Sequence, residues 1–128
     1  NLNNIPINND LIFEGNFYQE DGYKITKLLL KKFKGKFDSI FAASDLMAIG
    51  CLRALKEENI KIPEEIAIIG FDNIENSDIL YKALTTINTP ILTLGSLAAE
   101  KLITLIEKKE LKNKIDILDV NLVKRETV

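Results

Sequence analysis

The stretch FDSIFAASDLMAIG, from Phe37 to Gly50, decides the fold together with IAIIGFDN, from Ile66 to Asn73. In each stretch a short apolar run meets Ser, Asp or Asn where the chain must turn, which predicts a buried strand followed by polar residues. In parallel α/β proteins, ligands bind just beyond the carboxyl ends of such strands. The acids at these two positions, Asp45 and Asp72, are therefore the first candidates for a binding site.

The composition is that of one globular domain. The chain has 128 residues, of which 46% are hydrophobic and 28% are charged, which excludes a disordered polypeptide. The apolar runs are far shorter than the roughly 20 residues that cross a bilayer. The N-terminus also lacks the basic and then apolar pattern of a signal peptide. We therefore expect a cytoplasmic protein without membrane contact.

The sequence lacks residues that several kinds of enzyme need for catalysis. The sequence contains no histidine, which excludes zinc sites that need His and nucleophiles paired with His. Its single cysteine, Cys51, cannot form an internal disulfide. No glycine-rich phosphate loop is found either. We expect no metal, no cofactor and no enzymatic activity.

The charge distribution does not suggest DNA binding by these residues. The net charge is −2, whereas nucleic-acid-binding domains carry a concentrated basic face. The one basic cluster, from Lys31 to Lys36, follows a helical pattern and lies where a helix C-terminus favours cations. We interpret it as a solvated helix end.

The apolar periodicity predicts alternating helices and strands. The predicted helices are 19–32, 45–58, a short one at 76–81, and a long one opened by Thr89-Pro90; the predicted strands are 39–43, 66–70, 84–87 and 115–124. Repeated strand and helix units predict an α/β fold with a doubly wound, mainly parallel sheet and flanking helices. In the last strand the alternation changes phase at Leu118, which predicts a bulge or a crossing between two sheets.

The long helix after Pro90 is expected to have a buried face. Thr89 is predicted to cap it, with Pro90 in its first turn. The residues of the predicted buried face are Gly95, Ala98, Ala99, Leu102 and Ile106.

The helix 45–58 carries an apolar arc of about 200°, wide enough to cover a sheet. Leu46 and Ile49 project outside this arc, beside Arg53. A second protein surface or a neighbouring loop would explain two apolar side chains there. We favour self-association through this helix.

Six motifs span almost the whole chain: EGNF (14–17), SDLMAIG (44–50), IPEEI (62–66), GFDN (70–73), LTTI (84–87) and LVKRET (122–127). In this order they resemble the lactose/galactose repressor (LacI/GalR) family of bacterial transcriptional regulators. The resemblance implies a two-lobed effector domain of the type I periplasmic-binding-protein-like fold. Such a domain is hinged around a small molecule, behind a helix-turn-helix head that binds DNA.

The resemblance also implies how the chain divides. Residues 1–128 would be the C-terminal part of the effector domain. About 1–87 and 119–128 would belong to the C-terminal lobe, and about 88–118 would be a crossover helix and strand toward the N-terminal lobe. The DNA-binding head is absent from these residues, so we interpret the chain as a fragment.

Five ligand-binding residues are implied by the same resemblance. Phe17 matches an aromatic that stacks on a sugar or base, although an ordinary core Phe remains an alternative. Asp72 matches an acid that accepts hydrogen bonds from the ligand, or it caps the next helix. Asp45 contacts the ligand or caps its own helix. Ser44 stands where the family usually has Asn, and Thr89 is a hinge-side polar residue that can reach the ligand.

The resemblance implies a homodimer as well. In relatives the matching helix and the segment corresponding to 78–81 form part of the subunit interface. The predicted interface residues are Leu46, Ile49, Arg53, Leu80 and Tyr81, with Ile49 and Leu80 at the centre.

The predicted function is to sense a sugar or related metabolite and thereby control DNA binding by an upstream head. The ligand would stabilise one arrangement of the lobes through its differential affinity. One alternative is an extracytoplasmic sugar-binding receptor of the same fold. Another is a phosphoacceptor or enzyme that uses the acids at the strand ends, but the acid pair and the later lysine of a receiver domain are missing.

Overall fold

The computed structural model describes residues 6–33, 35–78 and 81–128. The elements are a short 3-10 helix η1 (Asn9–Leu11), α1 (Gln19–Phe33), β1 (Ser39–Phe41), α2 (Asp45–Glu57), β2 (Ala67–Asp72), β3 (Thr85–Asn88), α3 (Ile91–Ile106) and β4 (Asn121–Val123). The four strands form one sheet in the order β1-β2-β3-β4. The first three are parallel, and β4 runs antiparallel to β3. The predicted α/β fold with a mainly parallel sheet and flanking helices is confirmed.

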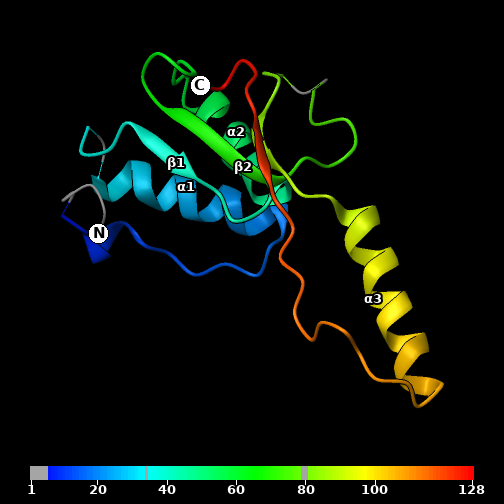
Figure 1. Ribbon diagram of the computed structural model, residues 1–128. Coiled ribbons are helices and arrows are strands. Elements are labelled where there is room, and N and C mark those ends of the chain that lie inside the picture. The colour runs from blue at the N-terminus through cyan, green and yellow to red at the C-terminus, as the bar shows by residue number, and fades with distance from the viewer. Residues whose placement is uncertain (1–5, 34, 79–80) are drawn as a thin grey trace.

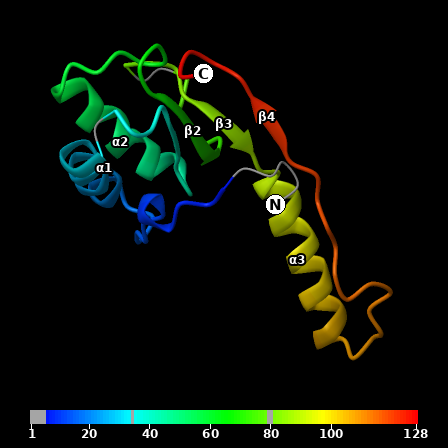
Figure 2. The ribbon, with the colours of Figure 1, turned by 90° about the vertical axis from the view of Figure 1, so that its left-hand side faces the viewer.

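The core lies between the sheet and two helices that pack on each other. Figure 2 shows α1 and α2 together on one side of the sheet. The predicted apolar arc of α2 is buried in full, as are Ile68 of β2 and Leu84 before β3. Glycine permits the close contact between the helices: a Cβ on Gly50 would overlap the backbone of α1, and one on Gly22 would overlap the backbone of α2.

The helix α3 extends away from this core (Figure 1). None of its residues is buried, and Leu92 is 88% exposed. The predicted buried face of this helix is therefore wrong for these residues. Lys101 of α3 bonds to the segment that follows: it pairs with Asp116 at 2.6 Å and donates to the Asn113 carbonyl at 2.7 Å. A helix buries its apolar face only where another element packs against it.

Two further predicted elements differ from the structure. Residues 75–78 form turns rather than the first part of a helix. The last strand is limited to β4, while Ile115 and Ile117 are 81% and 90% exposed in an irregular segment. A segment with alternating apolar and polar residues forms a strand only where it can pair with a neighbouring strand. In this segment only residues 121–123 pair with β3. The change of phase at Leu118 thus lies outside the sheet.

No helix within the described ranges combines the length and the apolar character needed to span a membrane.

Candidate ligand-binding site

The candidate site lies at the edge of the sheet where the three parallel strands end. β2 ends at Asp72 and β3 at Asn88, so their carboxyl ends are neighbours. The Thr89 hydroxyl donates a hydrogen bond to the Asp72 carbonyl, with 3.3 Å between the oxygens. The Ser44 hydroxyl, after β1, donates to the Phe17 carbonyl at 3.4 Å. Local contacts thus place Thr89 beside Asp72, and Phe17 beside Ser44.

Asp72 has the features of a ligand-binding acid. Its φ of 111° lies in a region that non-glycine residues rarely adopt, and such backbone strain is concentrated at functional sites. The side chain is half-buried, and among the described residues no hydrogen bond to its carboxylate is found. Burial raises the pKa of the Asp72 carboxyl, and the nearby Asp45 carboxylate raises it further. A desolvated acceptor without a partner is suited to a ligand hydroxyl.

Phe17 is 59% exposed, so it does not belong to the core that the described residues form. Its φ of 63° is left-handed. The turn places the aromatic ring on the surface immediately before α1. An exposed ring of this kind is free to stack on a flat ligand face.

Asp45 is completely buried and has partners for both carboxylate oxygens. Oδ1 accepts from the Thr86 hydroxyl at 2.6 Å, and Oδ2 accepts from the Ile74 N–H at 2.9 Å. Of the two alternatives for Asp45, capping of its own helix is wrong, because Ser44 is the cap and accepts from the Met47 N–H at 3.2 Å. Asp45 instead ties the start of α2 to β3 and to the loop after β2.

Thr89 is not the cap of α3. The N-cap is Pro90, and no side chain accepts a hydrogen bond there. The Thr89 hydroxyl instead donates its one proton to the Asp72 carbonyl. Its oxygen can still accept a hydrogen bond. The donated bond joins the last residue of β2 to Thr89, which lies two residues before α3.

A network around Asn73 supports the turn that carries Asp72. Asn73 has a φ of 54°, and its Nδ2 donates to the Asn88 Oδ1 at 3.0 Å. Its Oδ1 accepts from the Arg125 Nη2 at 2.8 Å. Arg125 also donates through Nη1 to the Leu84 carbonyl at 2.7 Å and to the Ser77 hydroxyl at 3.1 Å. Sequence reasoning missed this role, although Arg125 belongs to the quoted LVKRET motif.

The predicted interface residues form a patch on the outer side of α2. Leu46 is 44% exposed, Arg53 is exposed, and Ile49 is half-buried. Tyr81 lies against this side of the helix, because the Lys56 ammonium is 4.1 Å from the centre of its ring. Ile49, Arg53 and Tyr81 line one shallow hollow together with Leu52 and Lys56. Leu80 lies outside the described residues.

The sequence model of the periplasmic binding protein-like domain family matches residues 3–128. The chain belongs to this family. This periplasmic-binding-protein-like chain is 38% identical over 125 residues to the HTH-type transcriptional regulator RegA of Clostridium acetobutylicum. The match covers 98% of the chain but 37% of RegA, so the chain spans little more than a third of that relative.

Solved structures of transcriptional regulators are also similar to this chain. The transcriptional regulator CelR in complex with cellobiose matches with a TM-score of 0.92 and 26% identity, over 99% of this chain and 38% of that one. The lac repressor dimer bound to operator matches with a TM-score of 0.79 and 30% identity, over 89% and 39% respectively. The predicted resemblance of this periplasmic-binding-protein-like chain to LacI-type effector domains is confirmed. These relatives are transcriptional regulators rather than enzymes.

Proposed function

We propose that the chain is the C-terminal part of the effector domain of a cytoplasmic LacI/GalR-type regulator, and that it forms one wall of a site for a sugar or related metabolite. The observation that carries this proposal is Asp72, a strained and half-buried acid at the end of a central parallel strand. The complex of the relative CelR with cellobiose supports a sugar-like ligand.

The exposed helix α3 supports a second lobe. Its surface includes Leu92, Leu94, Leu102 and Ile106, each more than half exposed, which is costly for an isolated helix in water. We infer that residues 88–118 cross toward an N-terminal lobe, and that 1–87 and 119–128 form the C-terminal lobe. The greater length of RegA fits a protein in which further residues cover this helix.

Three of the predicted residues are proposed as ligand contacts. The Asp72 carboxylate accepts from a ligand hydroxyl, the Phe17 ring stacks on an apolar ligand face, and the Thr89 hydroxyl accepts a further bond. Ser44 and Asp45 are buried and engaged in the bonds described above. Their proposed role is to hold the loops that carry the contacts.

The proposal is tested in the longer protein, by which we mean this chain extended upstream to include both lobes. There Asp72→Ala is expected to weaken ligand binding by about 1.5–3 kcal/mol, because a hydrogen bond to a charged group is lost. Isothermal titration with a sugar, sugar phosphate or purine that binds the wild type would measure the loss. Glu75→Ala is the matched control, since Glu75 is an exposed acid of the turn that follows Asp72. Equal affinities of Asp72→Ala and wild type would remove Asp72 from the site.

We further propose that the patch on α2 is the interface of a homodimer. In such a dimer, closure of the lobes around the ligand changes the spacing of two DNA-binding heads and hence operator affinity. The lac repressor relative, described as a dimer bound to operator, supports this assembly.

Ile49→Glu is expected to shift the longer protein from dimer toward monomer, because it places an unpaired charge in a dry interface. Sedimentation velocity across a concentration series would show the shift. Leu28→Glu is the matched control, since Leu28 is an exposed apolar residue of α1. An unchanged sedimentation profile for Ile49→Glu would place the interface elsewhere.

A further inference from the structure

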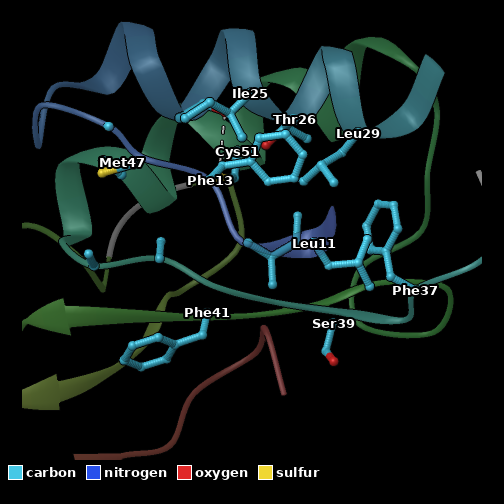
Figure 3. Close-up of a pocket in the computed structure, with 15 residues that line it drawn as sticks. Leu11, Phe13, Ile25, Thr26, Leu29, Phe37, Ser39, Phe41, Met47 and Cys51 are labelled. Atoms are coloured by element: carbon cyan, nitrogen blue, oxygen red, sulfur yellow. Dashed lines mark hydrogen bonds between the residues drawn. The ribbon is translucent and has the colours of Figure 1, made fainter. Parts of the chain in front are cut away.

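The inner and outer sides of α1 and α2 differ in chemistry. Ile25, Leu29 and Cys51 line an apolar hollow on the side that faces the sheet (Figure 3). Arg53 follows Cys51 by two residues and Tyr23 precedes Ile25 by two, which turns each side chain by about 200° around its helix. Both therefore lie on the outer side of the helix pair. There the Arg53 guanidinium carbon is 4.6 Å from the centre of the Tyr23 ring.

Arg53 is held in one orientation on this outer surface. Its Nε donates to the Glu57 Oε1 at 3.2 Å, and the Tyr23 hydroxyl donates to the Glu57 Oε2 at 2.6 Å. Glu57 and the Tyr23 ring thus fix the plane of the guanidinium. The Arg53 side chain is still 56% exposed, and among the described residues no hydrogen bond from its Nη1 or Nη2 is found. A guanidinium in a fixed plane with two free amino groups is suited to bind a carboxylate through two parallel hydrogen bonds.

Asp78 is an exposed acid near the patch on α2. Tyr81 of that patch follows it by three residues, so the two Cα atoms are at most about 11 Å apart. The turn that carries Asp78 has a fixed base, because Ser77 is buried and accepts from the Arg125 Nη1 at 3.1 Å. Within the described ranges the Asp78 carboxylate has no ion pair. The neighbourhood of the patch thus offers a free carboxylate as well as a prepared guanidinium.

We propose that Arg53 binds the Asp78 carboxylate of a second copy of this chain. This inference rests on the homodimer proposed above. In a two-fold dimer the patch of one copy meets the same patch of the other, so each contact is made twice. Arg53 and Lys56 give the α2 side of the patch two cations, and two such sides in contact would repel each other. The repulsion is removed when the acidic turn 75–78 of each copy lies against the α2 side of the other.

The pair fixes which arrangement of the two copies is formed. Apolar residues such as Ile49 supply area without direction, whereas a planar guanidinium accepts a carboxylate only along its edge. Because Glu57 and Tyr23 already hold the Arg53 side chain, little conformational entropy is lost when the second copy binds. Glu57 and Tyr23 are therefore positioning residues for the contact.

The test is sedimentation velocity of the longer protein with reversed charges at the two positions. Arg53→Glu brings carboxylates together at both contacts, and Asp78→Arg brings guanidinium groups together. Each variant alone raises the dissociation constant of the dimer by at least about a hundredfold. Glu75→Arg, at the other exposed acid of the turn, is the matched control and leaves the constant unchanged. A wild-type constant for Arg53→Glu or Asp78→Arg overturns the pair, whereas a monomeric wild type overturns the proposed homodimer and the pair with it.

A mixture of the two variants separates a contact between copies from a contact within one chain. In a mixed dimer the carboxylate introduced at position 53 meets the guanidinium introduced at position 78, and the native Arg53 meets the native Asp78. Both contacts are attractive, so mixing restores the wild-type dissociation constant to within about tenfold. Failure of the mixture to recover overturns the proposal. So does recovery that needs both substitutions in one chain.

Neutral substitutions provide the same test if Arg53→Glu does not fold, which circular dichroism would show. Arg53→Gln and Asp78→Asn each weaken the dimer by at least about tenfold, and the double variant weakens it little further, because the singles remove the same contact. Losses that add in the double variant overturn the pair.

Discussion

Gly50→Ala is expected to lower the free energy of unfolding by about 3 kcal/mol or more, the upper range for overpacking a core. A Cβ at this position would overlap the Gln19 carbonyl oxygen and lie 2.7 Å from the Tyr23 nitrogen. Both atoms belong to the backbone of α1, so no change of rotamer relieves the clash. The two helices would have to separate, which would open the contact that buries the arc of α2.

Urea denaturation of the 128-residue chain would measure this effect. Gly95→Ala is the matched control, because Gly95 is also a helical glycine but has no atom within 4 Å of an added Cβ. In that variant the higher helix propensity of Ala is expected to be neutral or to stabilise by up to about 1 kcal/mol. Equal stabilities of the two variants would contradict the close contact of α1 with α2.

Asp45→Ala is expected to cost about 3 kcal/mol of stability. Two hydrogen bonds to a buried charge are lost, and the Thr86 hydroxyl and the Ile74 N–H are left without their acceptor. Asp38→Ala, at an exposed acid before β1, is the control and is expected to change stability by less than about 0.5 kcal/mol. Denaturant midpoints of both variants would show the difference.

Asp45→Ala also separates two roles for this acid. A residue that only holds the loops lowers stability but leaves the affinity of the folded longer protein largely intact. A ligand contact would lower both. A stable Asp45→Ala variant that has lost ligand binding would contradict the buried hydrogen-bonded role.

The helices α1 and α2 could be predicted because their pattern is encoded locally. The helices predicted at 19–32 and 45–58 were found at 19–33 and 45–57. Their apolar residues recur with the helical period, and the surfaces that they pack against belong to the described residues. The outward position of Leu46 followed from the same geometry.

Other features depend on partners that are distant or absent from these residues. The exposure of α3 and the irregular backbone around Ile117 could not be read from periodicity, because an apolar pattern does not say whether its partner is present. The bond between Arg125 and Asn73 joins positions 52 residues apart. The cap of α2 is Ser44 rather than Asp45, for which capping was one of two open alternatives, since helix boundaries are set by single hydrogen bonds.

The most direct test is the thermal stability of the longer protein with a panel of sugars, sugar phosphates and purines. A compound at about 100 times its dissociation constant should add roughly 2.7 kcal/mol of stability. A ligand-binding site at the strand ends predicts such a shift for at least one compound, and its loss in Asp72→Ala at the same concentration. A stabilising compound that acts equally on wild type and on Asp72→Ala would contradict the site proposed at Asp72.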